Sequence, residues 1–252
     1  MRVVSAIIFT AVAILNAADA SFFGTWIFVP AKSSLIVPDI TFTELGPDQW
    51  RQTDQDGKAF TFKMDGQKYP DAYGAYVSAK KIDATTWQVT NYVDGKPASV
   101  DTMKLSADGK TLADTNRITV GKQLESSVLW HRVGSGAGFA GTWKGDPMAM
   151  PPFTLEVLPT GSDGLIFRVG DIVSVDAKFD GKFYPVTGSQ VPKGSTASFT
   201  RQSATAFHTI QKFPDGTTSL DAVVSVSNDG NTLTESGQAG TAKRVWVFER
   251  KK

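Results

Sequence analysis

Short apolar runs alternate with turn signals along the chain from residue 21 onward. The runs are rich in Val, Ile, Thr and aromatic residues and have the lengths of β-strands. They lie at 59–63, 75–80, 87–93, 100–105 and 124–132, and again at 153–158, 165–169, 172–179, 206–213, 220–227 and 244–250. Outside the first 20 residues, no window of a dozen residues places apolar side chains at helical spacing. The pattern predicts an all-β protein.

Asp-Gly pairs separate many of these runs and mark tight turns. They begin at Asp56, Asp65, Asp94, Asp108, Asp163, Asp180, Asp215 and Asp229. Asp-Gly favours the type I′ turn of a β-hairpin because both central residues of that turn need a positive φ. Many short strands joined in this way are typical of a barrel or a sandwich. A closed barrel protects its strand edges without disulfides, and this chain has no cysteine.

The second half of the chain repeats the first. Gly-Thr-Trp at 24–26 recurs at 141–143, and the later turn motifs follow in the same order at an offset of about 120 residues. A glycine-rich run at 134–138 separates the copies and indicates a flexible hinge. We therefore expect two domains, 21–133 and 139–252, each an up-and-down antiparallel β-barrel of about eight strands.

Each copy also opens with Gly-x-Trp and ends with an Arg near the close of its last strand. These residues are Gly24, Trp26 and Arg132 in the first copy and Gly141, Trp143 and Arg250 in the second. In this respect both copies resemble the calycins, which include the lipocalins and fatty-acid-binding proteins. The resemblance implies that each Trp plugs the closed end of its barrel with the Arg across its indole. Pro-Ala-Lys-Ser at 30–33 and Asp-Gly-Lys-x-Tyr-Pro-Val-Thr-Gly at 180–188 further resemble exported bacterial lipocalin-like proteins of uncharacterised function.

The first 20 residues have the order of a secretory signal. Arg2 is followed by an apolar run at 3–15 and then by Ala18-Asp19-Ala20, with small residues at the positions that a signal peptidase reads. We expect cleavage after Ala20 and a periplasmic or secreted protein, with a buried N-terminal helix as the alternative. The run is shorter than the roughly 20 residues of a membrane span, so we expect no membrane insertion after cleavage.

Composition argues against several classes of function. A formal net charge of +1 gives no basic footprint for nucleic acid, and the lack of cysteine excludes thiolate nucleophiles and thiolate metal sites. The chain has only His131 and His208, and no motif of the common hydrolases or nucleotide enzymes. We therefore expect no catalytic residue, no metal and no cofactor. Nothing in the sequence indicates an oligomeric state.

Some carboxylates lie in or beside predicted strands, where a pair could do acid–base work. They are Asp101, Asp114, Glu125, Asp171, Asp176 and Asp221. The strand register that would show whether any two of them meet is not given by the sequence. Exposure on the solvent face of a half-buried sheet is the default expectation for all of them.

A candidate ligand site lies in the second copy. An apolar, proline-rich loop suits a lid over a barrel mouth or, equally, a loop packed against the neighbouring barrel. It contains Met148, Met150 and Phe153. In the run 206–213, alternation places His208 on one face and four side chains on the other. The four are Phe207, Thr209, Gln211 and Phe213. If that face lines the lumen, it offers the aromatic walls and polar groups of a small-molecule pocket, while a packed core is the alternative.

Three functions stay open. We favour a non-catalytic protein that binds a small apolar or aromatic molecule in a barrel lumen. The alternatives are an isomerase, hydratase or lyase on the same scaffold, and an interaction module of the cell envelope with filled barrels. A large apolar lumen would favour binding, a lumen with convergent ionisable groups of shifted pKa would favour an enzyme, and a packed lumen would favour the third function.

Overall fold

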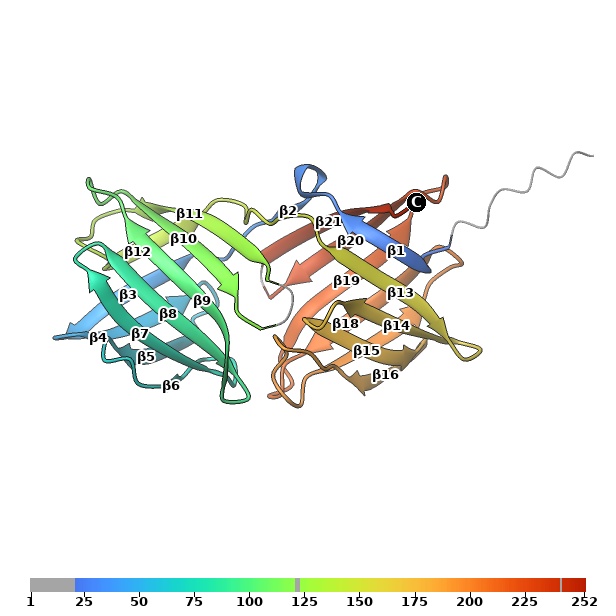
Figure 1. Ribbon diagram of the computed structural model, residues 1–252, viewed down its shortest axis with the longest axis horizontal. Coiled ribbons are helices and arrows are strands. Elements are labelled where there is room, and N and C mark those ends of the chain that lie inside the picture. The colour runs from blue at the N-terminus through green and yellow to red at the C-terminus, as the bar shows by residue number, and fades with distance from the viewer. Residues whose placement is uncertain (1–20, 121–122, 241) are drawn as a thin grey trace, which may run out of the picture.

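The computed structural model describes residues 21–120, 123–240 and 242–252, so the expected signal peptide at 1–20 lies outside the described residues. The described chain forms two nearly closed antiparallel β-barrels side by side (Figure 1). The all-β class with two tandem barrels is confirmed. Each barrel has ten strands in its hydrogen-bonded order rather than about eight. Tight turns and very short strands, such as the two-residue β6, fit the additional strands into the same length of chain.

We call the two sheets barrel I and barrel II. Barrel I consists of β3 (Ile40–Gly46), β4 (Gln49–Asp54), β5 (Ala59–Lys63), β6 (Tyr69–Pro70), β7 (Tyr76–Asp83), β8 (Thr86–Val93), β9 (Lys96–Leu105), β10 (Thr111–Ile118), β11 (Glu125–Val133) and β12 (Gly141–Gly145). Barrel II consists of β1 (Gly24–Phe28), β13 (Thr154–Thr160), β14 (Gly164–Val169), β15 (Val173–Lys178), β16 (Asp180–Pro185), β17 (Thr196–Arg201), β18 (Ala206–Lys212), β19 (Thr218–Val226), β20 (Thr232–Ala239) and β21 (Ala242–Arg250). The short helix η1 (Pro30–Lys32) and the strand β2 (Ser34–Leu35), which pairs with β21, follow β1.

The two copies exchange their first strands. The strand β1, from the first copy, pairs with β13 and β21 in barrel II, where Figure 1 shows it in blue beside the late strands. The strand β12, from the second copy, pairs with β11 and β3 in barrel I. The division into 21–133 and 139–252 therefore marks the sequence repeat and does not coincide with the barrels. Both strands carry the same Gly-Thr-Trp motif, so each presents equivalent side chains to its sheet.

The exchange changes the role of two connecting segments. The glycine-rich run at 134–138 joins β11 to β12 inside barrel I, so it is a hairpin connection and not a hinge between the barrels. The chain crosses between the barrels at 36–39 and again at 146–153. The proline-rich loop of the second copy is therefore a crossing segment.

The Trp and Arg residues meet across the copies. Arg250 lies over the indole of Trp26, with 4.1 Å from its Cζ to the ring centroid, and Arg132 lies over Trp143 at the same distance. Both indoles are fully buried. Gly24 has a φ of 148°, and a Cβ there would lie 2.5 Å from the Arg250 Nη1. Glycine is required at this position because the guanidinium occupies the place of a side chain.

The interiors of the barrels differ. Barrel II is filled by aromatic side chains, with the Phe22 and Phe207 ring centroids 5.0 Å apart and those of Phe28 and Phe153 stacked at 4.7 Å. Barrel I has a core at its closed end, where the Trp87 and Phe139 rings stack at 3.8 Å. An open lumen lies beyond that core. Across the part of the chain that the structure describes, no helix has the length and apolar character to span a membrane.

Candidate functional site in the lumen of barrel I

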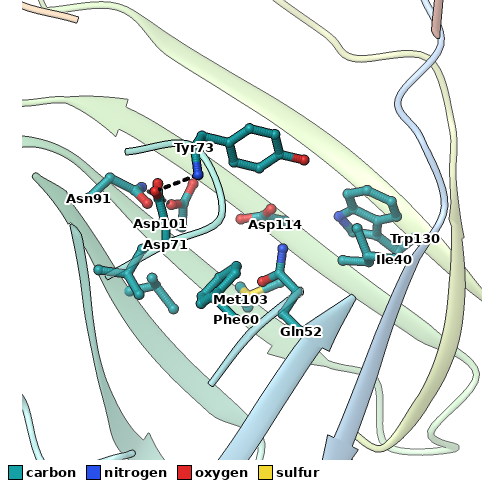
Figure 2. Close-up of a pocket in the computed structure, with 12 residues that line it drawn as sticks. Ile40, Gln52, Phe60, Asp71, Tyr73, Asn91, Asp101, Met103, Asp114 and Trp130 are labelled. Carbon is teal, nitrogen blue, oxygen red and sulfur yellow. Dashed lines mark hydrogen bonds between the residues drawn. The ribbon is translucent and has the colours of Figure 1, made fainter. Parts of the chain in front are cut away.

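The lumen of barrel I holds a cavity of about 250 Å³ (Figure 2). Its walls combine apolar and polar side chains from β3, β4, β5, β7, β8, β9, β10 and β11 and from the loop after β6. They are Ile40, Gln52, Phe60, Asp71, Tyr73, Val77, Val89, Asn91, Asp101, Met103, Asp114 and Trp130. A few convergent polar groups among apolar walls are the usual composition of a small-molecule site.

Strand alternation and register bring Asp101 and Asp114 into this lumen together. On β9, Asp101 and Met103 share the inward face because side chains two residues apart point the same way. On β10, Asp114 lies opposite Met103, and Asn116 lies opposite Asp101. The two carboxylates are therefore diagonal neighbours on adjacent strands, within reach of each other's charge. The default expectation of solvent exposure was wrong for this pair.

Two amides hold the Asp101 carboxylate in place. The Nδ2 of Asn116 donates to Oδ1 of Asp101 at 2.6 Å, and the Nδ2 of Asn91 donates to Oδ2. The Oγ of Ser99 accepts from the same two amides, at 3.0 Å and 3.2 Å. Burial raises the pKa of Asp101, and the two amide hydrogen bonds lower it. The network fixes the position of this carboxylate without supplying a positive charge.

Asp114 has neither such a network nor a counter-ion. Burial, followed by the charge of Asp101, raises its pKa to about 7, and the nearby indole N–H of Trp130 acts in the opposite direction. Its Oδ1 and the Trp130 Nε1 are both buried, and neither makes a hydrogen bond of normal geometry. Figure 2 shows Asp114 between Asp101 and the indole of Trp130. The site therefore offers a carboxyl group that changes charge near neutral pH and has hydrogen-bonding capacity to spare.

The mouth of the lumen faces barrel II. Asp71 Oδ1 accepts the backbone N–H groups of Tyr73 and Ala75, both at 2.8 Å, which orders the loop after β6. The Tyr73 hydroxyl donates to Asp54, and burial followed by this hydrogen bond raises the pKa of Tyr73. The Tyr73 ring lies 5.5 Å from the ring of Phe213 in barrel II. It separates the lumen from a second cavity of about 420 Å³ that both barrels line.

The structure does not gather the candidate ligand residues of the second copy around one cavity. Met148 packs against the core of barrel I, while Met150 and Phe153 pack in barrel II, because the crossing segment divides them. Phe207 and Thr209 face inward, as alternation predicts, but Phe207 lies in the packed aromatic core. The remaining two line a cavity of about 120 Å³ near the mouth of barrel II. They are Gln211 and Phe213.

The other ionisable candidates lie on the surface. His131 Nε2 is 3.1 Å from Asp146 and His208 Nε2 is 2.6 Å from Asp221, and all four side chains are substantially exposed. The expectation of a surface position is thus confirmed for Asp221, and His131 also lies on the surface. It is also confirmed for Glu125, Asp171 and Asp176. Within the described ranges, no group of three or more His, Asp or Glu side chains has the arrangement of a metal site.

The sequence reasoning missed Asn91 and Trp130 as lumen residues and Asn116 as a hydrogen-bond partner of Asp101. The sequence did indicate which face of β10 points inward, because Leu112 is an apolar residue directly after a turn and lies in the core. Counting in twos from Leu112 places Asp114 and Asn116 on the same inward face. The feature that marks this strand is a set of polar residues at positions where strand alternation predicts inward-facing side chains.

Comparison of the chain with protein-family models, with curated proteins and with solved structures gave no match.

Proposed function

We propose that this protein is an exported, calycin-like binding protein that holds one small molecule in the lumen of barrel I. The observation that carries the proposal is the contrast between the two lumens. Barrel II is packed with aromatic rings, whereas barrel I encloses about 250 Å³. Buried polar atoms without a hydrogen-bond partner occur in both barrels, and in barrel I those of Asp114 and Trp130 border the open cavity. Unsatisfied buried polar groups cost stability, so a site that keeps them is typical of a place where a ligand supplies the partners.

The size and lining of the lumen define the ligand class. A volume near 250 Å³ lies slightly below the usual range for ligand sites, about 300–1,000 Å³, so the ligand is a small organic molecule. Ile40, Val77, Val89 and Met103 offer an apolar wall, and the carboxylates lie among them on the same cavity surface. The ligand is therefore amphipathic rather than purely apolar, and it binds in barrel I rather than against Phe207.

The calycin-like and exported parts of the proposal have separate support. The calycin-like part is supported by a Trp–Arg contact in each barrel, Arg250 with Trp26 and Arg132 with Trp143, with each pair joining the two copies rather than lying within one. Export rests on the order of charge, apolar run and small residues in the first 20 positions.

A second candidate function is acid–base catalysis on the bound molecule. It is favoured by the pKa of Asp114, raised to about 7 beside a second carboxylate, which suits a group that both takes and gives a proton at neutral pH. Binding without turnover is our first choice because Asp101 is committed to two amides, leaving one free carboxyl group.

Ligand-detected NMR with a panel of small fragments, including benzyl alcohol and benzylamine, tests the binding proposal. Val89→Phe fills the lumen, and Leu129→Phe enlarges an exposed side chain on the same barrel as a matched control. We expect saturable binding that Val89→Phe abolishes and Leu129→Phe leaves unchanged. Native mass spectrometry of the protein recovered after export adds a search for a co-purified molecule. Fragment binding that is equal in both variants would contradict a site in the lumen.

A further inference from the structure

The lumen of barrel I contains acidic side chains that no basic side chain of its wall balances. Its lining residues include the carboxylates Asp71, Asp101 and Asp114, and no Lys, Arg or His. Asp71 accepts two backbone N–H groups and Asp101 accepts two amide N–H groups. Asp114 is therefore the carboxyl group with the most open acceptor capacity, and Asp101 lies beside it. A buried carboxylate without a partner is costly, and structures normally pair it or neutralise it.

Barrel II shows how the same fold treats this position. Leu112 and Asp114 follow the turn before β10 as Leu233 and Glu235 follow the corresponding turn before β20. Glu235 is only 2% exposed, so its carboxylate is deep in barrel II. It corresponds to Asp114 because both residues lie at the same distance from the turn and both side chains point into their barrel.

Glu235 has an internal cation. The Nη2 of Arg244 lies 2.5 Å from Glu235 Oε1 as an ion pair, and the Arg244 guanidinium lies over the Trp246 indole at 3.3 Å from its centroid. Burial lowers the pKa of Arg244, and the charge of Glu235 opposes that effect. Barrel II therefore contains, built from its own side chains, a cation held by a carboxylate and an aromatic ring.

Barrel I keeps the carboxylate and lacks the arginine. Arg244 lies opposite Gly237 on β20, and the residue opposite Asn116 on β10 is Ser126. Ser126 therefore stands at the place of Arg244. At the position of Asp101 on β9, the corresponding strand β19 has Ala222, because Ala222 lies opposite Gly237 as Asp101 lies opposite Asn116. Barrel I thus has one more carboxylate and one fewer cation than barrel II at matching places.

We infer that the lumen of barrel I takes a small organic cation, with an ammonium, amidinium or guanidinium group held by Asp101 and Asp114 where barrel II places the guanidinium of Arg244. The inference rests on the proposed function, since it names the class of ligand for the same lumen. Charge complementarity carries it, together with a second observation on the wall. Asp114 Oδ1 on the cavity wall is buried and accepts no hydrogen bond of normal geometry, so an acceptor is left open for a ligand N–H.

The remaining walls fit the apolar part of such a ligand. Trp130, Phe60 and Tyr73 supply ring surfaces that favour a nearby cation. Val89 and Met103 offer an aliphatic surface for the carbon skeleton. N–H donors of the ligand would complete the hydrogen bonding of Asp114 Oδ1, which accepts no hydrogen bond of normal geometry from the described residues.

Binding of a cation is linked to the ionisation of Asp114. The titratable groups that line the cavity with it are Asp101 on β9 and Asp71 and Tyr73 in the loop after β6. The raised pKa of Asp114, about 7, means that this carboxyl group is mostly protonated at pH 5.5 and mostly ionised at pH 8. A cationic ligand prefers the ionised form, so its affinity rises with pH through neutrality. A neutral ligand of the same shape has no such preference.

The experiment is calorimetric titration of the mature full-length protein with benzylamine and with its neutral isostere benzyl alcohol, at pH 5.5 and pH 8. We expect benzylamine to bind at least about tenfold more tightly than benzyl alcohol at pH 8, and to lose most of that advantage at pH 5.5. Asp114→Asn should weaken benzylamine at least about tenfold and leave benzyl alcohol unchanged. Asp221→Asn, at an exposed carboxylate of barrel II, is the matched control and should change neither affinity.

A second variant tests the comparison between the barrels directly. Ser126→Arg places an arginine in barrel I at the position of Arg244 and should abolish benzylamine binding by supplying the cation internally. Equal affinity for benzylamine and benzyl alcohol, with no effect of Asp114→Asn, would overturn the inference and leave the small-molecule proposal intact. Binding of neither probe would overturn the inference and, if the fragment panel is also negative, the proposed function with it.

Discussion

Replacing Trp26 tests the strand exchange, because the exchange decides which barrel loses stability. Trp26 is fully buried, its Nε1 donates to the carbonyl of Phe22 at 3.0 Å, and Arg250 of barrel II lies over its ring. Trp26→Ala should cost about 3–5 kcal/mol, the usual range for a buried Trp. That total includes the lost contact with Arg250, about 0.5–2 kcal/mol. Trp143→Ala is the matched variant, with the same burial and a hydrogen bond of the same length to Phe139.

Hydrogen exchange followed by mass spectrometry locates the loss. For Trp26→Ala, peptides from 154–250 should exchange faster by roughly a hundredfold to several thousandfold, and peptides from 40–133 should keep their protection. Trp143→Ala should give the reverse pattern. Faster exchange at 40–133 in Trp26→Ala, with 154–250 unaffected, would show that Trp26 closes the barrel of its own copy and would refute the exchange.

Three further predictions follow from the interiors and the connections. Because the folded-state pKa of Asp114 is about 7 and its ordinary value is 3.8, the folded protein binds more protons between these values, and Asp114 lowers stability as pH rises from about 4 to about 7. Asp114→Asn should remove this loss of stability, which is at most about 4 kcal/mol at pH 8, and urea unfolding at pH 5 and pH 8 measures it. An equal pH dependence of stability in the wild-type protein and the variant would show that Asp114 is not the cause. Arg244→Ala should lower the free energy of unfolding by about 3–5 kcal/mol because it leaves Glu235 buried and unpaired, whereas Arg168→Ala, at an exposed ion pair, should lower it by under about 1 kcal/mol. Similar thermal unfolding of the two variants would count against the buried pair. A fragment spanning 36–148 contains every strand of barrel I and should unfold cooperatively by itself, and a non-cooperative melt would show that barrel I needs barrel II.

The sequence predicted the local structure well because hairpin turns are a local property. The Asp-Gly pair beginning at Asp108, for example, joins β9 to β10 as expected. The strand exchange could not be predicted in the same way. Two strands with the same Gly-Thr-Trp motif fit either barrel, and only the lengths and paths of the crossings at 36–39 and 146–153 decide between the arrangements. Long-range packing therefore decides which barrel each of these strands joins, and the repeated motif alone does not predict it.

The site was harder to predict than the fold for a related reason. Asp101 and Asp114 could be named as carboxylates in strands, but their meeting depends on the register of β9 against β10, which sets Met103 opposite Asp114. A shift of one residue in either strand would send the carboxylate of that strand to the solvent face. The Met-rich loop misled because apolar irregular sequence is also what a crossing requires when its side chains pack against two cores. Met148 and Phe153 serve the packing of different barrels at the two ends of that crossing.

The exchange also has a consequence for the lumen of barrel I. Two crossings tie the barrels together, and further contacts join them on the side of the lumen mouth. Lys58 Nζ lies 3.8 Å from Asp215 Oδ2, and Phe213 lies against Tyr73. Barrel II thus forms part of the surroundings of the mouth, even though its own interior is filled. A packed barrel with an internally neutralised Glu235 is a stable neighbour for an open one. The two copies therefore differ at the same place: barrel II balances Glu235 with its own Arg244, and barrel I leaves Asp101 and Asp114 in a cavity whose lining residues include no Lys, Arg or His.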